Sequence, residues 1–271
     1  MDDLSLVRRM AEQVRDATAD YAADHEDYAE IITHRPRDVT RKIDLAAEKA
    51  LDEAVIREGL KARIISEEIG ERIVPEGATP ELTLLCDPVD GSNNFVSGIT
   101  YYCTTLALSR KPDGATFAHL DAAAVSSPHM GTFYAARGRG AFLSGRPIKA
   151  GRTGYKPIYS IYVYGSGTIP LGLIKLQERD CIVRTMGSIA LDICMVARGS
   201  FDVVIDTRNK VSGYDVMAAG LILREAGGNF SLLNGWSPDD LPLDTIGLSI
   251  IGASDEAMRD KILLELEKYP D

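Results

Sequence analysis

The chain of 271 residues lacks any apolar run near ~18 residues, the length that a helix needs to cross a bilayer. We therefore expect no membrane-spanning helix and no membrane partner. The first ten residues, MDDLSLVRRM, begin with acids and lack an apolar centre, so they predict no secretory signal.

Cysteine is scarce and irregularly placed. The chain has four cysteines with unequal gaps, apolar neighbours and no C-x-x-C pair: Cys86, Cys103, Cys181 and Cys194. This pattern argues against a disulfide framework and predicts buried free thiols in a reducing compartment, hence a cytoplasmic protein.

Basic residues are outnumbered, with 30 Lys and Arg against 40 Asp and Glu and a net charge of −10. Such an acidic chain is a poor candidate for binding nucleic acid or an anionic membrane surface. It suits a protein that gathers carboxylates around cations. The length and the 45% hydrophobic content indicate one large globular domain or two closely packed halves.

The first 150 residues predict helices followed by an antiparallel sheet. Apolar residues recur at helical spacing over 4–21 and 43–55, with Thr40 as N-cap and Gly59 as C-cap of the second helix. A meander of strand-like runs follows, and RGRGAF at 137–142, after the last run, predicts a hairpin turn. The runs are 62–66, 82–86, 103–109, 116–125 and 131–137.

Around residues 145–157 the pattern changes to strands that alternate with helices, which predicts a more open α/β arrangement. We therefore divide the chain into an N-terminal α+β half, 1–150, and a C-terminal α/β half, 151–271. The expected helices of the second half lie near 168–178, 188–199 and 214–228 and at the end of the chain.

Two aspartates, Asp87 and Asp90, end an apolar run in the stretch LTLLCDPVDGSNNF. A simple turn is the default interpretation. Counted from Asp87, an EF-hand would need oxygen ligands where Val89 and Gly98 stand, so that site is excluded. The Asp-x-Asp pattern of phosphatases that form an aspartyl-phosphate also fails, because the acids are three apart. Two carboxylates leaving one strand end can instead hold a pair of Mg²⁺ ions.

Other residues fit a site for metals and phosphate. Gly91 allows a close approach of the backbone to a ligand, and Ser92 can open a short helix whose N–H groups bind an anion. Glu67 and Glu68 end the strand in ISEEIG, and Asp215 begins a helix in GYDVMAAG. Taken alone, the two glutamates indicate a solvated turn, and Asp215 indicates a helix N-cap. Because neighbouring residues of a strand point to opposite faces, only one of the two glutamates would face a site.

In combination, these segments resemble the inositol monophosphatase family of Mg²⁺-dependent sugar-phosphate phosphatases over nearly the whole chain. The segment DPVDGSNNF resembles the family signature D-P-[IL]-D-G-[ST]-x-N-[FA]. Further resemblance lies in ISEE, DVTRKID, GSIALDICMVARGSFDVVID and GYDVMAAGLILREAGG. It implies a layered αβαβα sandwich, with an antiparallel sheet in the N-terminal half and a mixed α/β C-terminal half, and usually a homodimer.

The resemblance also implies two or three Mg²⁺ ions per site, for which Mn²⁺ can substitute. Glu67, Asp87 and the main-chain carbonyl of Val89 would hold the first ion. Asp87, Asp90 and Asp215 would hold the second, and a weaker third ion would rest on Glu67 and waters.

The implied reaction is in-line attack by a metal-bound water without a phospho-enzyme. Glu67 and the Ser92 hydroxyl would orient this water, and Asp44 would accept a hydrogen bond from Ser92. The amides of Gly91 and Ser92 would take phosphate oxygens. Glu68 would support the site rather than bind metal.

The implied sugar-binding positions are Asp90, Gly187, Ser188, Ile189 and Asp206. The chain departs from the family pattern where Ser92 replaces threonine, Tyr214 replaces tryptophan and Asp206 replaces glutamate.

The segments DGSNN and IDTRNKVSGYD resemble the archaeal branch, whose members often cleave both inositol phosphates and fructose 1,6-bisphosphate. A second phosphate needs additional cations, for which Arg208 and Arg184 are candidates, whereas Lys210 is better interpreted as a solvated surface charge.

Three functions stay open at this point. The favoured one is a phosphomonoesterase acting on small-molecule inositol and sugar phosphates. A 3′-phosphoadenosine phosphate phosphatase would need an adenine-stacking surface that the sequence does not reveal. A non-enzymatic, metal-binding regulatory protein would not need to keep the complete set of acids.

Overall fold

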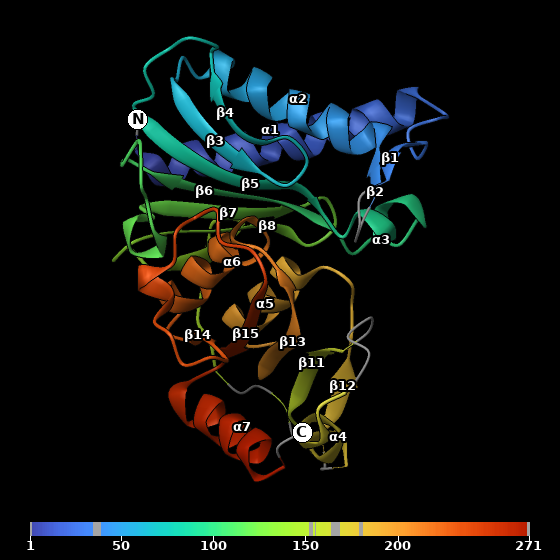
Figure 1. The fold of residues 1–271 in the computed structure, drawn as a ribbon, viewed down its shortest axis with the longest axis vertical. Helices are drawn as coiled ribbons and strands as arrows, with labels where there is room; N and C mark the ends of the chain where they lie inside the picture. The colour runs from blue at the N-terminus through green and yellow to red at the C-terminus, as the bar shows by residue number, and fades with distance from the viewer. Residues whose placement is uncertain are drawn as a thin grey trace.

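The computed structural model describes residues 2–34, 39–151, 154, 156–163, 169–178 and 181–269. Its elements stack in five layers, helices–sheet–helices–sheet–helices, so the predicted αβαβα sandwich is confirmed (Figure 1). None of the described helices is both long and apolar enough to cross a bilayer.

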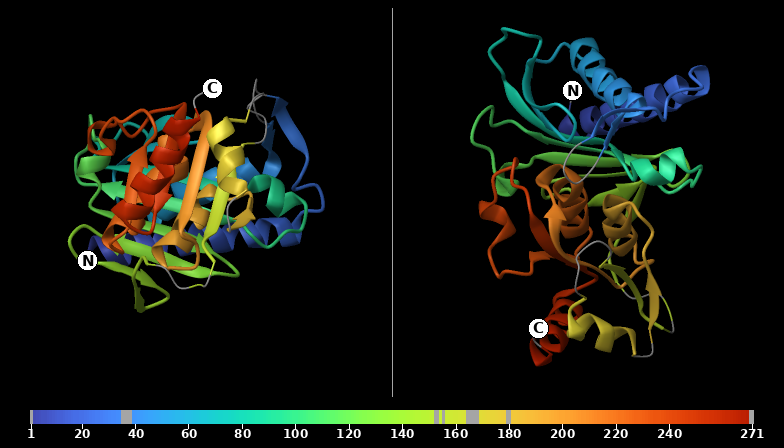
Figure 2. Two further views of the ribbon diagram at one scale, coloured as in Figure 1. Left: turned by 90° about the horizontal axis from the view of Figure 1, so that it is seen from below. Right: turned by 45° about the vertical axis from the view of Figure 1, so that its right-hand side comes forward.

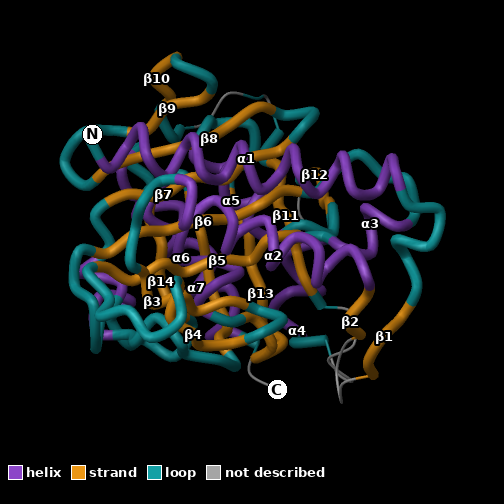
Figure 3. The backbone as a smooth tube through the Cα atoms, turned by 90° about the horizontal axis from the view of Figure 1, so that it is seen from above, coloured by secondary structure: helices purple, strands orange, loops and turns teal. Residues whose placement is uncertain are grey.

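Two helices form the outer layer of the N-terminal half, α1 (Asp3–Asp24) and α2 (Lys42–Arg57). Both pack on one face of an eight-stranded sheet, and Figure 3 shows them lying across it. The N-cap of α2 is Arg41 rather than the predicted Thr40. The C-cap is Glu58 rather than the predicted Gly59, which is the next residue and has the φ of +67° typical of a glycine just past a helix end.

The strand order of the first sheet is β10-β9-β8-β7-β6-β5-β3-β4. Every neighbouring pair is antiparallel except β3 and β5, which run parallel, so the prediction of a wholly antiparallel sheet is wrong there. The reason is that β4 forms a hairpin on one side of β3, which leaves β5 to pair on its other side. The strands are β3 (Ala62–Ser66), β4 (Gly70–Val74), β5 (Leu82–Asp90), β6 (Cys103–Ser109), β7 (Ala122–Ser127), β8 (Gly131–Ala136), β9 (Ala141–Leu143) and β10 (Arg146–Ile148).

Two strand predictions in this sheet need correction. The run 116–125 is not one strand: a 3₁₀ turn (Phe117–His119) precedes β7, because buried Phe117 and Leu120 turn inward at a corner. Strand β5 continues past its predicted end at residue 86, since Asp87 and Asp90 still pair with β6 across a local irregularity.

A pair of short strands, β1 (Ile31–His34) and β2 (Val39–Arg41), and the five-residue helix α3 (Ser92–Val96) gather at one end of the first sheet (Figures 1 and 3). The sequence analysis predicts neither strand, because each is too short for a periodic pattern.

The second sheet has the order β12-β11-β13-β15-β14 and mixed strand directions, as predicted for this half. Strand β11 is parallel to β12 and β13, whereas β15 is antiparallel to β13 and β14. The strands are β11 (Ile158–Tyr162), β12 (Ile182–Arg184), β13 (Val203–Val211), β14 (Asn229–Leu232) and β15 (Leu248–Ala253).

Helices α5 (Ile189–Ala197) and α6 (Gly213–Glu225) lie between the two sheets, and α4 (Leu171–Gln177) and α7 (Glu256–Lys268) cover the outer face of the second sheet (Figure 2). One apolar core joins Leu85 and Ala107 of the first sheet to both inner helices and to Val204 and Ile250 of the second. The halves are therefore closely packed, and the division at residue 150 stays a prediction.

The cysteines are free thiols, as predicted. Cys86, Cys103 and Cys194 are buried, whereas Cys181 is half-buried.

Candidate active site

The parallel pairing of β3 with β5 places Glu67 beside Asp87. Ser66, the last residue of β3, is the register partner of Cys86, so Glu67 follows the end of β3 at the level of Asp87 in the parallel strand β5. Asp215 approaches from the first turn of α6, and the carboxylate oxygens of Glu67, Asp87 and Asp215 lie within 4.8 Å of one another. Three predicted metal ligands from distant segments thus converge.

Thr105 on β6 holds two of these segments together. Its hydroxyl accepts a hydrogen bond from the Asp87 N–H (2.9 Å) and donates to the Tyr214 carbonyl (2.9 Å). The Val89 N–H donates to Asp87 Oδ1 (2.8 Å), which orients that carboxylate at the end of β5.

The cluster is electrostatically unfavourable on its own. Burial raises the pKa of Asp87 well above its usual value, and the charges of Glu67, Asp90 and Asp215 raise it further. The pKa of Asp215 is raised well above its usual value by burial and by Glu67. An all-oxygen, carboxylate-rich donor set of this kind fits hard divalent cations, whose charge offsets the repulsion.

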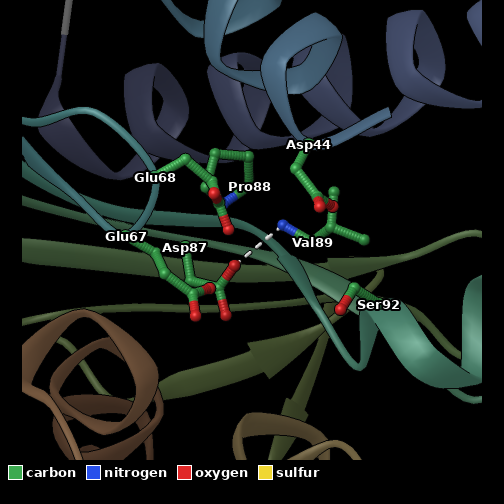
Figure 4. A pocket seen from close by; sticks show the side chains of 7 residues that line it. All are labelled: Asp44, Glu67, Glu68, Asp87, Pro88, Val89 and Ser92. Atoms are coloured by element: carbon green, nitrogen blue, oxygen red, sulfur yellow. Dashed lines mark hydrogen bonds between the residues drawn. The ribbon is translucent and has the colours of Figure 1, made fainter. Parts of the chain in front are cut away.

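The cluster opens into a pocket that gathers most of the predicted catalytic and metal-binding residues. Figure 4 shows Glu67 and Asp87 on one side of this pocket, Asp44 approaching from α2, and Ser92 at the start of α3. The lining residues are Asp44, Glu67, Glu68, Asp87, Pro88, Val89 and Ser92.

Asp44 and Ser92 belong to two helix starts that are tied together by Arg41. The Arg41 N–H donates to Asp44 Oδ2 (2.7 Å), and the Arg41 guanidinium donates to Asn93 Oδ1 on α3 (2.9 Å). The hydrogen bond from Ser92 to Asp44 stays a prediction.

The backbone conformation at position 91 favours glycine. Its φ of +91° is in the left-handed region, and a Cβ there would lie 3.2–3.3 Å from Tyr101 O, Ser188 Cβ and Tyr102 Cβ. This conformation starts α3, so the proposed phosphate-binding amides depend on a glycine at this position.

Asp90 connects the two halves. Its Oδ2 accepts hydrogen bonds from Ser188 Oγ (2.6 Å) and the Ala190 N–H (2.9 Å), with Cys103 Sγ at 3.7 Å. Burial raises the pKa of Asp90 to about 6, although the bonds from Ser188 and Ala190 lower it. All three contacts are made to Oδ2 and none of them to Oδ1, the oxygen that would have to bind a metal. The assignment of Asp90 as a metal ligand stays a prediction.

A second pocket adjoins the cluster and shares Asp215 with it. Its lining includes three predicted substrate positions, Asp90, Gly187 and Ile189, together with Arg208. The full lining is Asp90, Tyr162, Gly187, Ile189, Arg208, Lys210, Val211 and Asp215. Lys210, interpreted from the sequence as a surface charge, is exposed but also lines this pocket.

Asp206 and Arg208 form a buried ion pair at the edge of this pocket. Arg208 donates to Asp206 through its backbone N–H, Nε and Nη2, with the shortest contact at 2.6 Å. Its guanidinium also lies over the Tyr162 ring, 5.0 Å from the centroid. Asp206 is fully buried, so it could bind sugar hydroxyls only if this pair opened.

Two other predicted substrate residues lie differently. Ser188 is fully buried and bonded to Asp90, so it orients Asp90 rather than lining the second pocket. Arg184 is exposed on β12, donates to the Val183 carbonyl (2.8 Å) and lies outside the described lining of both pockets.

The comparisons with known proteins agree with this geometry. The model of the Inositol monophosphatase family matches residues 3–270. The chain belongs to this family.

Its curated relatives include a fructose-1,6-bisphosphatase/inositol-1-monophosphatase from Methanothermobacter thermautotrophicus, 33% identical, with 96% of this chain and 94% of the relative covered. A fructose-1,6-bisphosphatase from Pyrococcus furiosus is 32% identical, with 85% and 84% covered. A solved inositol monophosphatase-fructose 1,6 bisphosphatase has a TM-score of 0.79 at 27% identity, with 98% and 100% covered.

As a member of the inositol monophosphatase family, the chain is an enzyme of the phosphoric monoester hydrolase class. The family is metal-dependent, and the cluster of Glu67, Asp87 and Asp215 is suited to hold metal in this member.

The sequence analysis did not identify several residues whose side chains contact residues of the acidic cluster or of the two pockets. Thr105 and Tyr162 gave no signal, because their roles depend on distant partners. Glu48 did offer one: it stands four residues after Asp44 and therefore on the same face of α2.

Proposed function

We propose that the protein is a Mg²⁺-dependent phosphomonoesterase that hydrolyses inositol monophosphate and fructose 1,6-bisphosphate. The observation that carries the proposal is the convergence of Glu67, Asp87 and Asp215 within 4.8 Å, beside a pocket that contains Arg208. The names of the relatives from M. thermautotrophicus and P. furiosus support the two substrates.

Glu67, Asp87 and the Val89 carbonyl would hold one cation, and Asp87, Asp90 and Asp215 a second. Bound there, Mg²⁺ or Mn²⁺ would acidify water and stabilise the charge that develops on the phosphoryl group. Magnesium is favoured because the donors are all oxygens and the cluster is held by short contacts from β5, β6 and α6.

The chain's own groups would bind and orient the reactants. The Glu67 carboxylate and Ser92 Oγ would position the attacking water, with the Ser92 hydroxyl donating a hydrogen bond to Asp44. The backbone amides of Gly91 and Ser92 would bind phosphate oxygens at the start of α3. The Asp-x-Asp pattern of aspartyl-phosphate enzymes does not occur at this strand end, so direct attack by water is proposed.

Arg208 would distinguish the two substrates. The ion pair with Asp206 and the contact with Tyr162 hold its guanidinium at the pocket edge, where it could bind the second phosphate of a bisphosphate. Inositol monophosphate offers no second phosphate and would gain nothing from this contact.

The test is a phosphate-release panel of inositol 1-phosphate, fructose 1,6-bisphosphate and 3′-phosphoadenosine 5′-phosphate, with Mg²⁺ and with excess EDTA. We expect release from the first two substrates, its loss in EDTA, and its return when Mg²⁺ exceeds the chelator. Turnover that persists in EDTA would overturn the metal assignment. Release from the nucleotide alone would replace the substrate assignment.

The homodimer and the cytoplasmic location stay predictions from the sequence.

A further inference from the structure

Glu48 is a fully buried carboxylate that none of the roles proposed above uses. It lies on α2, four residues after Asp44, so both side chains lie on one face of the helix. Glu48 contacts Ser66 at the end of β3, and Asp44 lines the pocket with Asp87 of β5. A fully buried glutamate is rare unless it is paired and hydrogen-bonded, so its partners indicate its role.

The Glu48 carboxylate accepts hydrogen bonds from the residues on both sides of Glu67. Its Oε2 accepts a hydrogen bond from Ser66 Oγ (2.8 Å), and its Oε1 accepts one from the Glu68 N–H (3.1 Å). Ser66 and Glu68 are the immediate neighbours of Glu67 in the sequence. The two bonds therefore fix the backbone from which the Glu67 side chain extends.

The side chains of this turn alternate about the backbone. Figure 4 shows Glu67 beside Asp87, and Glu68 on the side of Asp87 that is nearer α2. The Glu68 carboxylate accepts from Thr40 Oγ1 (2.7 Å), which holds it on the α2 side. With Ser66 and Glu68 held on that side, Glu67 faces Asp87 and Asp215.

Arg72 balances the buried charge. Its Nη2 donates to Glu48 Oε2 (2.8 Å) and to Asp52 Oδ1 (2.6 Å), and its Nη1 donates to Ser66 Oγ (2.8 Å). Arg72 lies on β4, so this network also ties the β3–β4 hairpin to α2. A paired carboxylate of this kind is rigid, because movement would leave a charge unpaired in the interior.

We propose that Glu48 is a positioning residue for metal binding: by holding Ser66 and the Glu68 amide, it sets the Glu67 carboxylate against Asp87 and Asp215. The inference rests on the proposed function, in which Glu67 is a metal ligand. Groups that orient a metal ligand typically contribute 10- to 100-fold to metal affinity.

Asp52 offers a matched control. It stands one further turn along α2 and pairs with the same Arg72, through Nε (2.9 Å) and Nη2 (2.6 Å). Its bonds to Arg72 do not involve the turn that carries Glu67. Asp52→Asn therefore weakens the same ion network and leaves the two bonds beside Glu67 in place.

The experiment compares the wild type, Glu48→Gln and Asp52→Asn as full-length proteins without substrate. Mn²⁺ binding is followed by electron paramagnetic resonance and by calorimetry, and thermal unfolding is recorded in EDTA. We expect Glu48→Gln to weaken Mn²⁺ binding about 10- to 100-fold and Asp52→Asn by less than about twofold. Unfolding in EDTA reports the stability effect that both variants share.

Wild-type Mn²⁺ affinity in Glu48→Gln would overturn the inference, whatever its unfolding temperature. Equal losses of affinity in both variants would overturn it too, by assigning the effect to the ion network as a whole. If Glu48→Gln does not fold, Ser66→Ala removes one of the two contacts, and a severalfold loss of Mn²⁺ affinity is then expected, with unchanged affinity as the overturning result.

These outcomes separate the inference from the proposed function. Normal hydrolysis of both substrates with normal Mn²⁺ binding in Glu48→Gln would reject the inference alone. A wild type that binds Mn²⁺ but releases no phosphate, together with weakened binding in Glu48→Gln, would reject the proposed function and keep the positioning role. A wild type that binds no Mn²⁺ would reject both.

Discussion

Asp90, at the end of a strand in the first sheet, accepts a 2.6 Å hydrogen bond from the hydroxyl of Ser188, 98 positions later in the chain. The Ala190 N–H reaches the same oxygen, so the start of α5 is fixed against the end of β5. Because Gly187 and Ile189 flank Ser188 and line the second pocket, this bond fixes the position of that pocket relative to the acidic cluster.

Asp215→Asn should abolish most turnover without loss of the fold. The sequence interpretation of Asp215 as an N-cap is wrong: Ser212 is the N-cap, and Asp215 is the third helical residue, accepting from the Ser212 N–H (2.5 Å). Asparagine keeps an acceptor oxygen for that bond but removes one charge from the cluster. We expect a loss in kcat of roughly a hundredfold or more, typical of removing a key electrostatic group.

The measurement is kcat at several Mg²⁺ concentrations, with circular dichroism as the control for folding. A near-normal rate at low Mg²⁺ would limit Asp215 to its helix-capping bond.

Ser92→Ala should lower kcat and leave KM nearly unchanged. The substitution removes only the hydroxyl, and the backbone amides at the start of α3 persist because the Gly91 conformation is unaltered. An interaction made chiefly in the transition state appears in kcat rather than in KM. Steady-state kinetics on inositol 1-phosphate tests this, and a large increase in KM at constant kcat would contradict it.

Arg208→Ala should impair fructose 1,6-bisphosphate hydrolysis more than inositol monophosphate hydrolysis. The expected difference in the activation free energy of kcat/KM is about 1.5–3 kcal/mol, the scale of a charged hydrogen bond. Arg184→Ala is the control, because Arg184 is exposed outside the described pocket linings. Equal losses on the two substrates would restrict Arg208 to a structural role.

The same substitution leaves the buried Asp206 carboxylate without its ion-pair partner. Asp206 is 0% exposed and Arg208 9%, so Arg208→Ala leaves a carboxylate without its cation and should destabilise the fold by about 3–5 kcal/mol. The double variant Asp206→Asn/Arg208→Ala removes that charge and should recover stability but not bisphosphate selectivity. Denaturant unfolding and kinetics on the same samples separate the two effects.

Asp192 makes the stability of the protein depend on pH. This buried carboxylate of α5 accepts hydrogen bonds from Tyr101 (2.6 Å), Ser160 (2.5 Å) and Tyr162 (2.8 Å). Burial raises the pKa of Asp192, although the three hydroxyls lower it. Between the unfolded value of about 3.9 and the higher folded pKa, the native state binds more protons than the unfolded state, so this contribution to stability falls as pH rises.

Asp192→Asn removes that titration. The free energy of unfolding of the wild type, minus that of the variant, should therefore be largest near pH 4 and decrease toward pH 7, by at most about 1.4 kcal/mol per pH unit. Denaturant unfolding in EDTA at several pH values measures it. A difference that is constant or increases with pH would contradict the assignment.

The sequence by itself determined which acids are candidate metal ligands and which local elements carry them. The runs at 62–66 and 103–109 match β3 and β6, and the helices of the C-terminal half lie within a few residues of their expected bounds, because burial of one face leaves a periodic pattern in the chain. The resemblance of several ordered motifs to the family grouped Glu67, Asp87 and Asp215 before any geometry was known.

Only the tertiary structure decided how these residues meet. In the predicted meander, which lacks β4, the runs 62–66 and 82–86 would be neighbouring antiparallel strands and could not deliver Glu67 and Asp87 to the same edge. Their parallel pairing does so, and it depends on β4 occupying the other side of β3. Likewise, Arg208 is held by Asp206 and Tyr162, and Glu67 is held through Glu48. The pairing of β3 with β5, the contact of Arg208 with Tyr162 and the bonds of Glu48 to Ser66 and Glu68 join residues that are distant in the sequence, so local periodicity cannot predict them.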